Sequence, residues 1–259
     1  MRIVAQGVVA CLAVVAPAML GQGAAQNGRG GSIQPGAWQI VVLANQARAA
    51  VGAGQLKWDT ALAEAARQHC LRMAAEGEIA HRYGGEPDLT LRAGQAGAHF
   101  SLIEENIAIG PDPATIHDEW MHSSGHRSNL LNPEVDRVGV ALVASRGVLY
   151  AVADYERAVQ VLTQAQVEEA IAALLRARGV NPASDPADAR AYCAQGRGAQ
   201  GSSQPGFRMM WQDADLSHLP GALLERLGTG QYSRAAVGSC APQDLEGSFT
   251  AYRVAVLLY

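Results

Sequence analysis

The sequence predicts an α+β fold, and three observations lead to this class. Apolar residues recur with helical spacing twice near the start of the chain, over 38–51 and 59–77. A third helical stretch, 113–121, precedes two apolar runs of β type at 138–143 and 148–154. Helical periods followed by a pair of strand-like runs around a turn indicate helices packed on an antiparallel hairpin.

Composition limits the class of protein. The chain has 259 residues, of which 49% are hydrophobic and 17% charged, with a formal net charge of -4. This length allows one large domain or two small ones, and the apolar fraction is enough to bury a core. No basic run has the density that binding to a phosphate backbone needs, so nucleic acid is excluded as the expected partner.

The N-terminus has the pattern of an export signal. Arg2 is the lone charge before an apolar stretch over 8–15, and small residues suited to cleavage follow. We therefore expect residues 1–25 to be a signal peptide and the protein to be secreted or periplasmic. The stretch is too short and too interrupted for a membrane span. Residues 26–35 are rich in glycine and polar groups and are expected to form a linker.

The folded region is expected to start after this linker. Glycines after residue 51 end the first helix, and a short extended connector leads to Asp59, the predicted N-cap of the second helix. That helix ends near Gly77. Residues 78–100 are rich in glycine and proline, contain the isolated His81, and are expected to be irregular, which in a compact domain usually means functional or mobile. Apolar character resumes around Glu105.

The cysteine pattern agrees with export. Once a signal peptide is removed, Cys70, Cys193 and Cys240 remain. Cys70 lies in a helical pattern and is expected to be a small buried hydrophobe. The other two lie in loop-like sequence, so we pair Cys193 with Cys240. Closing this loop would contribute about 4 kcal/mol on the chain-entropy model.

The last hundred residues predict a second, smaller unit. Helical spacing over 161–178 suggests that residues 159–190 form a helical linker, and residues 191–259 alternate strand-like and helix-like segments. We expect these to be a C-terminal α+β module. Its order of helix then hairpin echoes residues 113–154. Because chemically reactive side chains are sparse here, a packing role or a protein partner is the expected function of the module.

Several blocks resemble one known family. The blocks are Asn45-Gln-Ala-Arg48, Leu56-Lys-Trp58-Asp59, Leu62 with Ala65-Ala66, His81, Glu105-Asn106-Ile-Ala108, Trp120-Met-His-Ser-Ser-Gly-His126-Arg-Ser-Asn-Leu-Leu131 and Val138-Gly-Val140. In sequence and order they are similar to the bacterial branch of the CAP superfamily, which gathers the cysteine-rich secretory proteins, antigen 5 and the pathogenesis-related proteins. The resemblance covers about residues 36–158, which we expect to be the CAP domain (also called the SCP domain).

The resemblance implies an α-β-α sandwich of CAP type with a central cleft that holds two histidines and two acidic residues. Carried over by motif, these are His81, Glu105 and His126. At the fourth position, where eukaryotic members have a glutamate, this chain has Ser123. Glu119 lies four residues earlier, on the same helical face one turn back, and is the candidate for the fourth group.

Such a cluster suits one kind of chemistry in particular. Two neutral imidazoles that converge are good ligands for a divalent ion such as zinc, so His81 and His126 are the candidate metal ligands, with a carboxylate or water completing the shell. Without metal, a nearby carboxylate favours the charged form of histidine, and the cleft would change charge in the mildly acidic range. Alternatively, the four groups only hydrogen-bond to one another and fix the long loop against a helix.

Other combinations are weaker. His122 and His126 have the spacing of two ligands on one helical face, but Gly125 is expected to break the helix between them. Ser123 or Ser124 beside His126 lacks the turn and the third group of a hydrolase triad. An acid pair of Glu105 and Glu119 for glycoside cleavage would leave the histidines unexplained.

We therefore expect an exported binding protein without catalytic residues, rather than an enzyme. Its cleft would bind a divalent metal, or a lipid-like or peptide-like ligand. One alternative is a hydrolase of peptide or cell-wall material that uses metal-bound water. Another is a structural or adhesive envelope protein that acts through its C-terminal module. The fold by itself does not decide among these functions.

Overall fold

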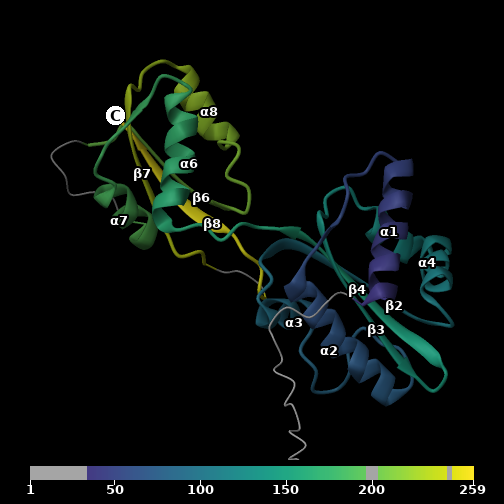
Figure 1. The fold of residues 1–259 in the computed structure, drawn as a ribbon. Coiled ribbons are helices and arrows are strands. Elements are labelled where there is room, and N and C mark those ends of the chain that lie inside the picture. Colours follow the sequence, from purple (N-terminus) through teal and green to yellow (C-terminus); the bar gives the residue numbers. More distant parts are fainter. Residues whose placement is uncertain (1–33, 197–203, 244–246) are drawn as a thin grey trace, which may run out of the picture. The chain divides into compact units, whose positions relative to one another are not determined.

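The computed structural model describes residues 34–196, 204–243 and 247–259. The predicted signal peptide and residues 26–33 of the predicted linker lie outside the described residues. Two four-stranded sheets, each packed with helices, make up the described part, and the α+β prediction is confirmed (Figure 1). None of the helices in the described ranges combines the length and the apolar character needed to cross a membrane.

The first sheet has the strand order β1-β3-β4-β2. Its strands are β1 (Lys57–Trp58), β2 (Phe100–Gly110), β3 (Arg137–Ser145) and β4 (Val148–Ala158). β1 is parallel to β3, and the other two pairs are antiparallel. The predicted hairpin is β3 and β4, joined by Arg146 and Gly147, which both have positive φ as a tight two-residue turn requires.

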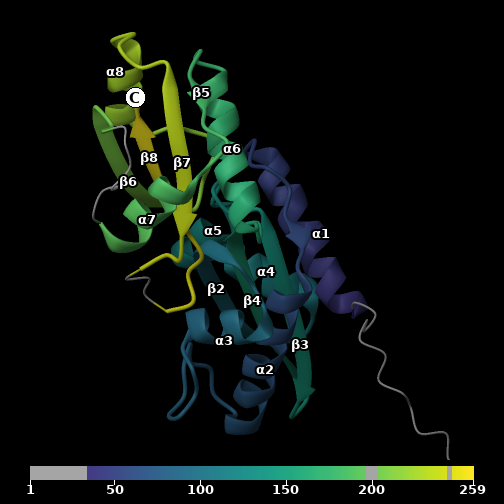
Figure 2. The same cartoon turned by 90° about the vertical axis from the view of Figure 1, so that its left-hand side faces the viewer.

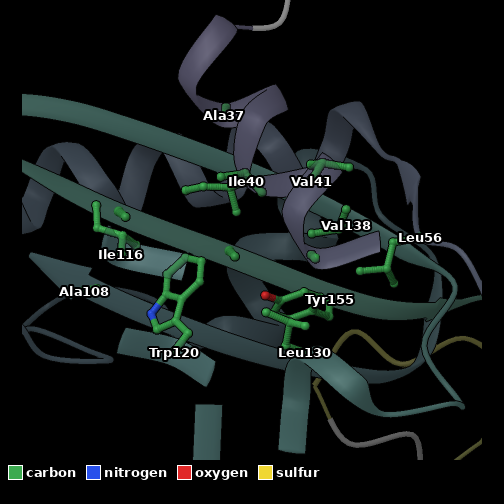
Figure 3. Close-up of a cluster of buried hydrophobic side chains, with 14 of the residues drawn as sticks. Ala37, Ile40, Val41, Leu56, Ala108, Ile116, Trp120, Leu130, Val138 and Tyr155 are labelled. Atoms are coloured by element: carbon green, nitrogen blue, oxygen red, sulfur yellow. The ribbon is translucent and has the colours of Figure 1, made fainter. Parts of the chain in front are cut away.

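Helices cover both faces of this sheet, which gives the predicted α-β-α sandwich (Figure 1). One face carries α1 (Pro35–Ala50), α4 (Pro113–His122) and α5 (Ser124–Leu131), and the other carries α2 (Thr60–Glu76) and α3 (Leu89–Ala96). Under α1, the fully buried side chains of Ile40, Trp120 and Tyr155 lie together (Figure 3). The indole N–H of Trp120 donates to the carbonyl of Ile107 in β2, which ties α4 to the sheet.

Two expectations for the helices differ from the structure. Residues 78–100 contain α3, which Asp88 caps by accepting from the amide of Leu91, so this segment is not irregular throughout. Its eight residues are too few to produce a clear period between glycine-rich flanks. The second difference concerns the break expected at Gly125. The break between α4 and α5 falls at Ser123, whose backbone is extended, and Gly125 lies inside α5. The predicted cap of α2 is confirmed, because Asp59 accepts from the amides of Ala61 and Leu62.

A fully buried arginine joins α1 to the rest of this sandwich. The guanidinium of Arg48 donates to the carbonyls of Gly54, Leu130, Asn132 and Val135 at 2.6–3.0 Å. Within the described residues it forms no ion pair. Two of its acceptors lie at the C-terminal end of α5, where helix carbonyls lack partners within the helix. Arg48 therefore fixes α5 against the end of α1.

The second sheet repeats the first in topology. Its order is β5-β7-β8-β6, with β5 parallel to β7 and the other pairs antiparallel. The strands are β5 (Asn181–Pro182), β6 (Phe207–Asp213), β7 (Arg234–Cys240) and β8 (Tyr252–Leu258), and the helices are α6 (Gln164–Arg176), α7 (Ala187–Gln195) and α8 (Gly221–Gly228). Along the chain the elements follow the order of the first sheet, and the described residues contain no counterparts of α3 and α5.

The second sheet also involves residues 159–190, which we expected to form a helical linker before a module that starts at 191. Ile171 and Leu175 of α6 lie in the second core together with Leu223 of α8. β5 pairs with β7 (Figure 2). The boundary at 191 stays a prediction. The predicted disulfide is present and joins Cys193 in α7 to Cys240 at the end of β7.

Each sheet has a glycine pressed against a helix. A side chain at Gly139 of β3 would meet the backbone of Ala63 at 2.0 Å, and one at Gly238 of β7 would meet the backbone of Arg190 at 2.2 Å. Ala63 and Arg190 are both the fourth residue of their helices, α2 and α7. The two glycines thus hold similar places, each pressed against the helix that follows the short parallel strand of its sheet.

We expect Arg48→Met to destabilise the protein by about 3 kcal/mol or more. Methionine fills the same space without donors, and each buried carbonyl that loses its donor costs roughly 1–3 kcal/mol. Urea unfolding followed by tryptophan fluorescence measures the loss. Arg67→Met, at an exposed arginine of α2, is the control and should change stability by less than about 0.5 kcal/mol. Equal small effects of both substitutions would contradict this role of Arg48.

The disulfide should stabilise the second sheet. We expect the pair Cys193→Ser and Cys240→Ser to lower its unfolding free energy by about 4 kcal/mol, because 47 residues separate the cysteines and the reduced chain gains that loop entropy. Amide hydrogen exchange of β7 and β8, measured against β3 and β4, localises the effect. Uniform acceleration in both sheets would show that the bond does not act on the second sheet alone.

Candidate functional site

The predicted residues His81 and Glu105 are in direct contact. Nδ1 of His81 lies 2.8 Å from Oε1 of Glu105. The Glu105 side chain is 4% exposed, whereas that of His81 is 60% exposed. Because a carboxylate oxygen accepts, Nδ1 carries the hydrogen, and the lone pair of the neutral ring lies on Nε2. A buried anion therefore orients an imidazole that solvent can reach.

The second oxygen of Glu105 is bound by Arg92, which the sequence analysis missed. Nη2 of Arg92 lies 2.5 Å from Oε2, and both side chains are almost fully buried. Nη1 of the same guanidinium donates to the carbonyls of Pro87 at 3.2 Å and His81 at 3.4 Å. Arg92 thus links α3, the loop that carries His81, and β2. Arg92 lies in α3, and the sequence was expected to be irregular there. No pattern in the sequence therefore indicated its role.

His69 in α2 supports the same loop from inside. Its fully buried ring places Nδ1 2.7 Å from Oε1 of Glu86 and Nε2 2.9 Å from the carbonyl of Ala80. The other oxygen of Glu86 accepts from the amide of Tyr83 at 3.0 Å. The burial of its ring makes His69 a packed side chain. The contacts add that it anchors the loop on both sides of His81.

His126 is positioned through the neighbour of Glu105. The side-chain amide of Asn106 donates to the carbonyl of His126 at 2.9 Å, and that of Asn129 donates to the Glu105 carbonyl at 3.2 Å and to Oδ1 of Asn106 at 3.1 Å. The segment Glu105-Asn106 in the edge strand β2 therefore holds both parts of the site. Glu105 binds the His81 loop, and Asn106 binds α5.

The two histidines have opposite electrostatic environments. The hydrogen bond to Glu105 raises the pKa of His81 above its ordinary value. Burial lowers the pKa of His126, and the positive charge of His81 lowers it further. His126 therefore lies within electrostatic reach of His81 and stays neutral over more of the pH range. We call His81, Glu105 and His126 the histidine site.

Glu119 is not part of the contacts of this site. Its side chain is exposed on α4, and within the described ranges it makes no hydrogen bond or ion pair with the other three residues. Its role as the fourth group stays a prediction. The described residues also contain no group of three or more His, Cys, Asp or Glu side chains placed to hold a metal ion. Within the described residues, a metal here would thus have fewer than three such side chains as ligands.

Comparison with known proteins gives a consistent assignment. Residues 42–155 match the model of the cysteine-rich secretory protein family (CAP). The Bacillus subtilis (strain 168) protein YkwD is 32% identical over 111 residues, which are 41% of this chain and 42% of that protein. The membrane protein YlbC of the same strain is 33% identical over 109 residues, 40% of this chain and 30% of that protein. This chain thus spans less than half the length of either relative.

Solved structures show the same kind of likeness. An extracellular protein containing an SCP domain from Bacillus anthracis str. Ames is 26% identical with a TM-score of 0.44, over 49% of this chain and 45% of that chain. An outer surface protein from Borrelia burgdorferi is 18% identical with a TM-score of 0.44, over 47% of this chain and 91% of that chain. Residues 42–155 of this chain form a domain of the cysteine-rich secretory protein (CAP) family, of bacterial type.

Proposed function

We propose that this chain is an exported binding protein whose histidine site takes a divalent metal ion. The observation that carries the proposal is the orientation of His81. Its Nδ1–H is held by the buried carboxylate of Glu105, and its exposed ring offers Nε2. A carboxylate behind a histidine is the arrangement that fixes ring orientation and raises basicity at metal sites. Zinc is the ion that suits two imidazoles best.

The electrostatics favour His126 as the second ligand. A ligating histidine must be neutral, and the lowered pKa of His126 keeps it so at neutral pH. The raised pKa of His81 acts the other way, because a proton competes with the metal for that ring. Metal affinity should therefore fall as the pH drops through the raised pKa of His81. With two protein ligands, open positions are left for water or for a donor of a peptide-like or lipid-like ligand.

Binding is favoured over hydrolysis by the burial of Glu105, the carboxylate that contacts His81 among the described residues. A metal-assisted hydrolase needs a general base that the attacking water can reach. The Glu105 side chain is only 4% exposed, and its oxygens face His81 and Arg92. Within the described ranges Glu119, the other predicted acid, makes no hydrogen bond or ion pair with the site. Hydrolysis of peptide or cell-wall material remains the alternative function.

Two further parts of the proposal rest on other features. The disulfide between Cys193 and Cys240 fits an exported protein, because such bonds persist in oxidising compartments. The C-terminal module is proposed to bind a protein partner, because its core is apolar and it has a single histidine, His218, among its described residues. This second part also keeps open the structural or adhesive role in the envelope.

We expect the mature protein to bind zinc with a stoichiometry of one, and the pair His81→Ala and His126→Ala to lose that binding. Isothermal titration calorimetry at neutral pH measures it. His122→Ala is the matched control, because His122 is exposed on α4 and bonds only within its own helix. If the double variant binds zinc as tightly as the unmodified protein, the metal proposal is wrong.

In the metal-free protein, we expect NMR titration to give a pKa above 6.5 for His81 and below 6.5 for His126. Glu105→Gln should bring the pKa of His81 down, since the amide carries no negative charge to stabilise the protonated ring. A histidine with a raised pKa stabilises the fold at pH below its ordinary pKa, and that contribution is lost as the pH rises through the raised value. An unchanged His81 titration in Glu105→Gln would show that the contact does not govern the site.

A further inference from the structure

Asp154 is a buried acid next to the histidine site. Asp154 in β4 is fully buried, and among the described residues neither of its carboxyl oxygens has a hydrogen-bond donor. An ionised carboxylate in that environment would cost several kcal/mol. A carboxyl group without donors therefore needs a specific explanation.

The strand register places this acid beside Glu105. Asp154 lies directly opposite Glu105 in the β2–β4 pair, so the two side chains project from the same face of the sheet. Directly opposite residues on one face of an antiparallel pair have Cβ atoms about 4.5–5.5 Å apart, which brings the two carboxyl groups within reach of each other. Burial raises the pKa of Asp154 well above its ordinary value, repulsion from Glu105 and more weakly from Glu156 adds to this, and the charge of Arg92 opposes it.

The location of the proton follows from the partners of each acid. Two carboxyl groups in contact cannot both be ionised without strong repulsion, but one proton between them makes a hydrogen bond. Glu105 is the ionised member, because Arg92 and His81 both bind it. Asp154 has no such cation in contact. A neutral Asp154 can donate its O–H to Glu105. This hydrogen bond gives the otherwise unpaired carboxyl group a partner.

The second sheet shows that the fold does not require this acid. Gly139 and Asp154 form one cross-strand row with Glu105, and Gly238, Ala255 and Met210 form the equivalent row in the second sheet. Both glycines press against a helix in the same way. In the second sheet the row is apolar throughout, so helix packing at this position needs no acid. Helix packing therefore does not account for the acid pair.

We propose that Asp154 is a positioning residue of the histidine site, a neutral acid whose O–H donates to Glu105 and keeps that carboxylate directed at His81. Asp154 and Arg92 hold the Glu105 carboxylate from the buried side. The carboxylate in turn holds the exposed ring of His81. The inference concerns the site of the proposed function, but it requires no metal to be bound. It can therefore fail or hold independently of zinc binding.

The test compares the metal-free protein with Asp154→Asn and Asp154→Val. Asparagine keeps a neutral donor of the same shape, whereas valine keeps the approximate volume, suits a strand and donates nothing. The first readout is the NMR titration of His81. We expect the raised pKa of His81 to be preserved in Asp154→Asn and to fall toward the ordinary value in Asp154→Val, because Glu105 is then free to turn away.

Two other patterns would overturn the proposal. If Asp154 were ionised, both variants would remove a negative charge, and the pKa of His81 would fall in both. If Asp154 only filled space, the pKa of His81 would change in neither. Infrared difference spectra between the unmodified protein and Asp154→Asn at pH 7 give a second, independent readout. They should show the C=O stretch of a protonated carboxyl group, and a carboxylate band in its place would also refute the inference.

Discussion

The buried guanidinium of Arg48 is the interaction on which the geometry of the site depends. Its four acceptors are main-chain carbonyls of the connection after α1 and of the segment that ends α5. Carbonyls at these positions have no helical or sheet partner, so one planar group with five donors satisfies several of them at once. Arg48 fixes the C-terminal end of α5, and Asn106 and Asn129 join α5 to β2. Because α5 carries His126, these contacts also position that histidine.

Local patterns were enough to predict much of this fold from the sequence. The cap at Asp59, the glycine that ends α2 and the β3–β4 hairpin are all decided by residues within a few positions of one another. The family resemblance supplied His81 and Glu105 as a pair, which adds what local patterns cannot. Arg92 and Asp154 were not predicted, because their role comes from strand register and from a short helix without a clear period. Nothing in their own neighbourhood distinguishes them from ordinary helix and strand residues.

The two sheets separate what the fold needs from what the site needs. They share strand order, strand directions and a glycine against the first helix that follows the short parallel strand. They differ in the row next to that glycine, which is acidic in the first sheet and apolar in the second. Within the described residues they also differ in α3 and α5, which are present beside the first sheet and carry Arg92 and His126. These added elements therefore supply part of the site, while Glu105 comes from β2, a strand of the shared topology.

Keeping such a site costs stability, and the arrangement of charges limits that cost. One anion, Glu105, sits between the buried cation Arg92 and an exposed imidazole that can share a proton with solvent. Unpaired, this carboxylate would be expensive to bury, whereas with one firm cation its charge is balanced whether or not His81 is protonated. His81 is then free to exchange its proton for another cation without leaving Glu105 unpaired. His81 at the surface, beside a carboxylate whose charge Arg92 balances, is thus suited to reversible binding. Binding or release of a cation at His81 changes the charge at the surface and not in the core.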